Sequence, residues 1–229
     1  MRRLAAVFAA SVVWALTIGS VAAQSDQPLV SDSAISESDD NTPPANPSAR
    51  EPSHEYPLSR SGTWDLSVWA SEAIGNSAYG DVGDVYVSMA GFRTGYVFAR
   101  PDMHGRFRGT VEYFFDVIPV FVLTKPKVIY GGGFSPIGFK WNFIGGRRHP
   151  FVETSVGGIL TTRNVPPGDT SNFNFTLTAR GGLTLMSRPR NSLTGNVGFW
   201  HLSNAHMGDT NPSLNAFTFG VEYHWFRVK

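Results

Sequence analysis

The alternation that decides the fold is clearest at residues 173–185, which read FNFTLTARGGLTL. Phe173, Phe175 and Leu177 take every second position, and asparagine or threonine fills the positions between them. Successive side chains of an extended strand point to opposite faces of a sheet. Residues 173–185 are therefore predicted to form a β-strand with one apolar face and one polar face.

The same period of two recurs through residues 62–229, where Gly, Pro, Asn and Asp separate aromatic-rich segments. Phe139 and Trp141 alternate with Gly138 and Lys140, and a similar segment runs from residue 217 to residue 225. No helical periodicity competes with this pattern. We expect eight strands, at residues 62–74, 84–99, 105–123, 131–145, 150–163, 172–187, 192–204 and 214–227.

Two architectures fit such alternation. In a soluble sandwich or lipocalin-like barrel the apolar face points inward, whereas in a transmembrane barrel it points to lipid and the polar face fills the interior. Several segments exceed the roughly 9–11 residues that a tilted strand needs to cross a bilayer. Ionisable residues also lie within the strands on the polar parity: Glu112, Asp116, Lys140, Glu153, Arg180 and Glu222.

Aromatic residues gather near the strand ends, as in the interfacial girdles of outer-membrane barrels. They are Trp64, Tyr96, Phe98, Trp200, Tyr223, Trp225 and Phe226. The sequence therefore favours an all-β fold, an eight-stranded antiparallel transmembrane β-barrel of the bacterial outer membrane. Side chains fill so narrow a barrel, so we do not expect a porin.

The segments before the barrel read differently. Residues 1–23 combine a basic start, an apolar stretch and small residues, which predicts a secretory signal peptide. Residues 24–61 are rich in Ser, Asp and Pro, which predicts a disordered leader, and residues 62–229 form the predicted barrel. A formal net charge of +1 gives no reason to expect nucleic-acid binding, and the absence of cysteine excludes a disulfide framework.

A base and a hydroxyl stand two residues apart near the end of the seventh predicted strand. His201 and Ser203 share the parity of the apolar residues Val197 and Phe199, so they are expected on the outward face. Asn215 has the outward parity on the next strand, across a loop at about residues 205–213. Neighbouring strands lie about 4.8 Å apart, so the three side chains can meet.

These residue types can perform acyl transfer. Serine is a weak nucleophile that needs an adjacent base, and histidine can take its proton and return it to the leaving alcohol. Asn215 can hold the imidazole in the required tautomer by accepting a hydrogen bond. Asn204, beside the serine, offers an amide donor for an oxyanion hole. A polar cluster that faces lipid costs free energy, so its presence indicates a function. Reaction with a lipid substrate would be such a function.

The segment from His201 to Ala205, with the run from Asn211 to Asn215 and a closing aromatic strand, resembles the PagL-type lipid A 3-O-deacylases, also called acyloxyacyl hydrolases. The specific match covers about residues 199–226. The resemblance implies an eight-stranded outer-membrane barrel that hydrolyses the ester-linked 3-hydroxyacyl chain at the 3-position of lipid A. It implies His201 as base, Ser203 as nucleophile and Asn204 at the oxyanion site, with no metal or organic cofactor.

One position departs from the family pattern. The best-known members carry a glutamate where this chain has Asn215. Asp209 in the loop is the alternative acid, whereas Glu222 has inward parity and is discounted. The expected partners are lipid A or lipopolysaccharide and the surrounding outer-membrane lipid, and a homodimer is left open. The competing hypotheses are a non-enzymatic structural or adhesive barrel and a soluble secreted lipid-binding barrel.

Overall fold

The computed structural model describes residues 56–75, 84–145 and 148–228. The predicted signal peptide and most of the predicted leader lie outside these residues. Eight strands follow one another, together with two short 3₁₀ turns, η2 (Pro57–Ser59) and η3 (Gly105–Phe107). The strands are β1 (Trp64–Gly75), β2 (Val85–Ala99), β3 (Gly109–Lys125), β4 (Ile129–Phe143), β5 (Pro150–Val165), β6 (Ser171–Ser187), β7 (Asn191–Ser203) and β8 (Leu214–Arg227).

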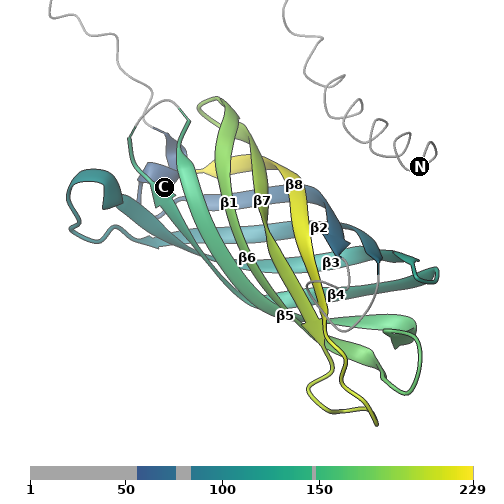
Figure 1. Ribbon diagram of the computed structural model, residues 1–229. Helices are drawn as coiled ribbons and strands as arrows, with labels where there is room; N and C mark the ends of the chain where they lie inside the picture. Colours follow the sequence, from purple (N-terminus) through teal and green to yellow (C-terminus); the bar gives the residue numbers. More distant parts are fainter. Residues whose placement is uncertain (1–55, 76–83, 146–147, 229) are drawn as a thin grey trace, which may run out of the picture. The chain divides into compact units, whose positions relative to one another are not determined.

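The strands form one closed antiparallel barrel (Figure 1). Each strand pairs with the next along the chain, and β8 pairs with β1 to close the sheet, with Leu66 opposite Trp225. The predicted number of strands, their order and the fold class are confirmed. The third strand begins later than predicted, at Gly109, because Gly105–Phe107 forms η3 instead of extending the strand.

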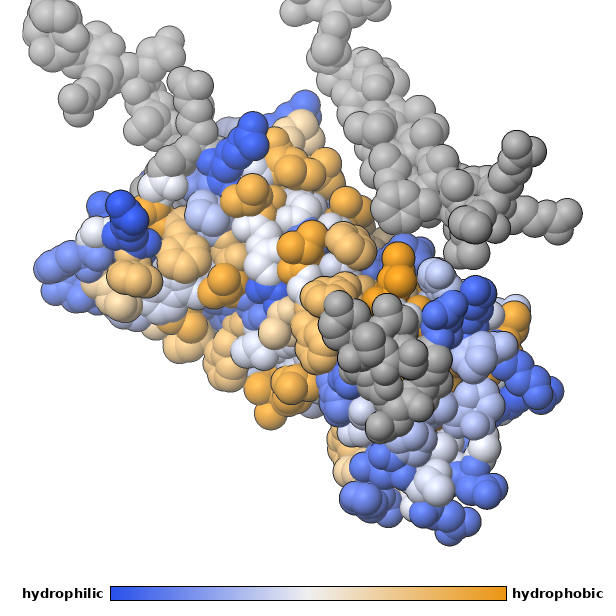
Figure 2. Space-filling model, in the orientation of Figure 1, coloured by the Kyte–Doolittle hydropathy of each residue, from blue (hydrophilic) through white to orange (hydrophobic). Residues whose placement is uncertain are grey.

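The outer wall of the barrel is apolar. Phe175, Leu177, Phe219 and Val221 face outward with exposed fractions between 37% and 47%, and the half-buried Trp141 shares the outward parity of Phe139. Figure 2 shows apolar side chains over the wall of the barrel between more polar ends. Among the described residues, no helix is long and apolar enough to cross a membrane. The outward orientation of the apolar faces, predicted from parity, is confirmed.

Charged side chains fill the middle of the interior. The guanidinium of Arg93 lies 2.8 Å from Asp116, 2.8 Å from Glu153 and 3.3 Å from Glu222, and all four side chains are buried. Ser67 donates a hydrogen bond to Glu222 as well. Four strands are linked through this one cation, because Arg93, Asp116, Glu153 and Glu222 come from β2, β3, β5 and β8. Arg93 offsets part of the negative charge of three carboxylates that the narrow interior cannot hydrate, and Arg180 lies 3.5 Å from Glu153 as a second cation.

The interior is not polar throughout, although the sequence pattern predicts that the polar face of each strand fills it. Toward the end of the barrel that carries the β7–β8 connection, the inward side chains form an apolar core that includes Phe121, Leu123, Ile159, Trp200 and Leu202. An eight-stranded barrel has no room for a water-filled lumen, so apolar side chains can pack across it as in a soluble core. In this half, apolar side chains therefore lie on both faces of the wall.

The predicted aromatic girdle is wrong for two of its members. Trp200 is 2% exposed and Phe226 is 8% exposed, because both have inward parity and pack inside the barrel. Trp64, Phe98 and Trp225 face outward and are each at least 40% exposed, as a girdle requires. An aromatic residue near a strand end therefore belongs to the girdle only if its parity also turns its side chain outward.

A short segment before β1 closes the end of the barrel where the described chain begins and ends. Tyr56 stacks on His149 with ring centroids 4.0 Å apart and meets the edge of Phe226. Leu58 is fully buried, and its carbonyl accepts a hydrogen bond from Thr110 at 2.6 Å. Residues 56–59, which precede the barrel start predicted at residue 62, are buried against the barrel.

We expect replacement of Arg93 by methionine to destabilise the barrel severely. The substitution leaves Asp116, Glu153 and Glu222 buried together without their shared cation, which typically costs about 3–5 kcal/mol. Urea titration of the refolded protein in detergent micelles measures the loss. Arg163→Met, at an exposed position, is the matched control and should change stability by less than about 0.5 kcal/mol. Equal effects of the two substitutions would contradict a central role for the Arg93 cluster.

Candidate active site

β7 and β8 bring the predicted site residues together on the outer wall. His201 lies directly opposite Asn215 in the strand register, and Ser203 ends β7. All three side chains are half-buried and outward-facing. Their neighbours along each strand point inward and are buried in the apolar core: Trp200, Leu202, Leu214 and Ala216. The inward side chains that alternate with the three polar residues therefore hold β7 and β8 against the apolar core beneath the cluster.

The three polar side chains form a hydrogen-bonded chain. The Nε2 atom of His201 lies 3.2 Å from the hydroxyl oxygen of Ser203, and its Nδ1 atom lies 2.7 Å from the amide oxygen of Asn215. The Asn215 amide nitrogen donates to the Ser213 hydroxyl at 3.4 Å, which leaves the amide oxygen facing the ring. Because that oxygen can only accept, the ring proton lies on Nδ1, and Nε2 can accept the serine proton.

The β7–β8 connection is organised around Asn204. Its side-chain amide donates to the carbonyl of Thr210 at 2.8 Å, and its side-chain oxygen accepts a hydrogen bond from the backbone of His206 at 3.0 Å. Its backbone nitrogen donates to Asn211 at 2.9 Å. Asn204 is 2% exposed and therefore shapes the loop that leaves the serine. The oxyanion role predicted for this residue stays a prediction.

The β7–β8 loop also rests on the neighbouring β5–β6 connection. The backbone nitrogen of Thr210 donates to the carbonyl of Asp169 at 2.9 Å, and the Thr210 hydroxyl donates to the same oxygen at 3.0 Å. Gly208 lies against Thr170 so closely that a methyl group at this position would overlap the Thr170 backbone. The loop beside the site is thus supported by a second loop.

The alternative acids occupy other places. Asp209 is exposed on the loop, and the Nδ1 position that an orienting acid would take is occupied by Asn215. Glu222 faces the interior, is 1% exposed and belongs to the Arg93 cluster. His224 is fully buried, and its Nδ1 atom lies 2.8 Å from Asp65. The geometry therefore favours Asn215 over Asp209 and Glu222 as the third residue.

An apolar surface surrounds the cluster. Phe175 and Leu177 of β6 lie opposite Ser203 and His201 in the register, and both are more than 40% exposed. Phe199 meets Phe217 edge to face with ring centroids 6.4 Å apart. A hydrocarbon chain could contact these rings while a polar group near the strand ends reached the serine.

The fold and the cluster together define a small transmembrane β-barrel with a hydrogen-bonded serine, histidine and asparagine on its lipid-facing wall. The family described as lipid A 3-O-deacylase (PagL) matches residues 59–224, and the chain belongs to this family. No curated protein sequence matches the chain. Among solved structures, the crystal structure of the outer membrane enzyme PagL is similar to it, with a TM-score of 0.47 and 17% identity over 67% of this chain and 97% of that chain.

Proposed function

We propose that the chain is an esterase of the bacterial outer membrane that removes the ester-linked 3-hydroxyacyl chain from the 3-position of lipid A. The family membership supports the substrate and the reaction. The observation that carries the mechanism is the position of His201, whose two ring nitrogens contact the Ser203 hydroxyl and the Asn215 amide oxygen. This is the arrangement that an activated serine nucleophile needs.

The reaction proceeds in two acyl-transfer steps. The Ser203 oxygen attacks the ester carbonyl as Nε2 of His201 takes its proton. The tetrahedral intermediate collapses, His201 returns the proton to the sugar oxygen at the 3-position, and the acyl chain stays on Ser203. Water, deprotonated by His201, then attacks the acyl-serine, and His201 returns the proton to the Ser203 oxygen as the bond between that oxygen and the acyl carbon breaks. The products are a free 3-hydroxy fatty acid and lipid A with a free 3-hydroxyl group.

The outward position of the cluster suits this substrate. Lipid A carries its acyl chains within the membrane and its esters near the interface, so a site on the outer wall near the strand ends meets the ester without extracting the lipid. Phe175, Leu177, Phe199 and Phe217 offer surface for the acyl chains. We assign Asn204 to the developing oxyanion as an amide donor, because it directly follows the nucleophile and its side-chain nitrogen carries a second N–H besides the one that donates to Thr210.

Asn215 supplies less electrostatic help than a carboxylate. Its oxygen can hold the Nδ1–H of His201, but a neutral amide stabilises the imidazolium formed during each step less than a negative charge does. A carboxylate on the lipid-facing wall would in turn carry a desolvation cost. The site lies near strand ends, close to headgroups and water. We therefore expect the stabilisation of the imidazolium by a carboxylate to outweigh the desolvation cost of that carboxylate.

We expect Ser203→Ala and His201→Ala each to lower the deacylation rate on purified lipid A by at least about a thousandfold. Both side chains lie on the outer wall, so neither change opens a core cavity and the barrel should still fold. The double variant should be little slower than either single variant, because the residues act as a unit. Ser187→Ala, at an exposed position on β6, is the control. Normal turnover by Ser203→Ala would eliminate this mechanism and indicate that another group is the nucleophile.

The third residue is tested by substitution at two positions. Asn215→Ala removes the hydrogen bond that orients His201 and should slow turnover about 10- to 100-fold, the effect expected for one such bond. Asn215→Glu should keep or raise the rate, since a carboxylate accepts the same bond and stabilises the imidazolium. Asp209→Ala should leave the rate unchanged. If Asp209→Ala alone impairs deacylation, the assignment of Asn215 is wrong.

A glycine on β1 also positions the site. A methyl group at Gly75 would overlap the backbone oxygen of Asn215, so Gly75→Ala should displace Asn215 from His201 and slow deacylation about tenfold or more. Gly181→Ala is the matched control, because its methyl group would lie 3.8 Å from the nearest atom beyond its own chain neighbours, the Phe151 carbonyl oxygen. Kinetics on purified lipid A compare the two variants. Equal rates in both would show that the contact with Gly75 does not hold Asn215 in place.

A further inference from the structure

The two ends of the barrel differ in charge. The end where the described chain begins and ends carries exposed arginines in the segments that flank the strands. We call this set the arginine rim: Arg60, Arg100, Arg106, Arg108, Arg148, Arg188, Arg190 and Arg227. Asp102 is the one carboxylate among the described residues of these segments, and it lies 3.7 Å from His104. The rim is therefore strongly cationic.

The opposite end, which carries the candidate active site, has balanced charges. Its described cations near the strand ends are Lys125, Lys127 and Arg163, and its carboxylates are Asp84, Asp169 and Asp209. Lys125 and Asp84 form an ion pair at 3.8 Å. The cationic character is thus confined to one end of the barrel and is not a general property of its polar surface.

The arginines lie where the apolar wall stops. Arg100 directly follows β2, Arg108 directly precedes β3, Arg188 directly follows β6 and Arg190 directly precedes β7. Outward aromatic side chains of the same end include Trp64, Phe98 and Trp225. Aromatic residues at this depth mark the interface between hydrocarbon and headgroups. The guanidinium groups therefore reach the depth of lipid headgroups.

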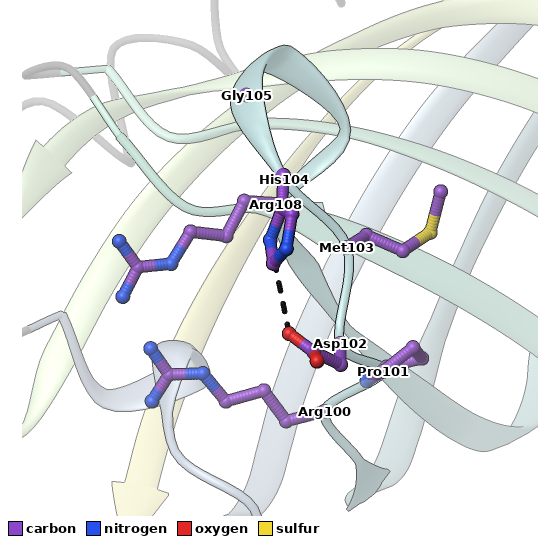
Figure 3. Close-up of a pocket in the computed structure, with 7 residues that line it drawn as sticks. All are labelled: Arg100, Pro101, Asp102, Met103, His104, Gly105 and Arg108. Carbon is purple, nitrogen blue, oxygen red and sulfur yellow. Dashed lines mark ion pairs between the residues drawn. The ribbon is translucent and has the colours of Figure 1, made fainter.

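The β2–β3 turn shows how a headgroup could be held. Arg100 and Arg108 line a hollow of about 430 Å³ together with Asp102, Met103 and His104. Figure 3 shows both guanidinium groups extending to the same side of the turn, while Asp102 turns toward His104. Two like charges on one hollow favour an anion between or beside them. The planar guanidinium fork matches the oxygens of a phosphate group.

We propose that the arginine rim binds the phosphate groups of anionic phospholipids in the membrane leaflet at this end of the barrel, with one headgroup seated between Arg100 and Arg108. A ring of cations at the edge of an apolar wall fits a layer of headgroups, whereas a soluble phosphate would need only a single site. Binding around the rim holds the barrel at a fixed depth. The proposal does not depend on the deacylase activity.

The test compares thermal unfolding of the mature chain folded into vesicles of phosphatidylcholine alone or mixed with phosphatidylglycerol. The anionic lipid should raise the unfolding midpoint of the unmodified protein by about 5 °C or more, since each rim arginine near an anionic surface contributes favourably. Arg100→Gln/Arg108→Gln and, separately, Arg188→Gln/Arg190→Gln should each lose a large part of this increase while unfolding as the unmodified protein does in phosphatidylcholine.

The matched control is Lys125→Gln/Lys127→Gln, which removes the same charge from the opposite end and should keep the whole increase. Three results would overturn the proposal. The first is an unmodified protein with the same midpoint in both vesicles. The second is an equal loss in the control and in both rim variants. The third is an equal increase when inorganic phosphate is added to phosphatidylcholine vesicles, which would indicate a site for a soluble anion.

Discussion

Because the sheet is closed, each side chain of a strand points either outward to the membrane or inward to the packed interior. In a barrel of eight strands the interior holds side chains and little else, so every inward residue must be packed or neutralised. The Arg93 cluster meets this requirement in the middle, and the apolar core around Phe121 and Trp200 meets it beneath the candidate active site. The outward residues between them are then presented on a rigid wall.

The packing of the inward residues also fixes the positions of the candidate active-site residues. His201 and Asn215 face each other across β7 and β8, and the residues on either side of them are locked into the core. Preorganisation of this kind matters because a hydrogen-bonded relay loses its effect when its members shift by about 1 Å. Asn204 and the contact between the two loops extend the same support to the turn that follows Ser203.

Much of this arrangement can be predicted from the sequence, because period-two alternation assigns both the strand and the face. Parity alone places His201, Ser203 and Asn215 on one face, and it excludes Glu222. The errors have physical causes. Trp200 and Phe226 lie inside because their parity outweighs their nearness to a strand end, and η3 delays the start of β3. The burial of Tyr56 and Leu58 depends on long-range contacts that no local pattern reveals.

Mass spectrometry of lipid A from cells that express this chain tests the central claim most directly. If Ser203 acts on the 3-position ester, lipid A should lose the mass of one 3-hydroxyacyl chain, and fragmentation should place the loss at the 3-position. The matching free 3-hydroxy fatty acid should appear, and expression of Ser203→Ala should leave lipid A intact. Unchanged lipid A in cells where the folded barrel is present in the outer membrane, or loss of a chain from another position, would contradict the claim.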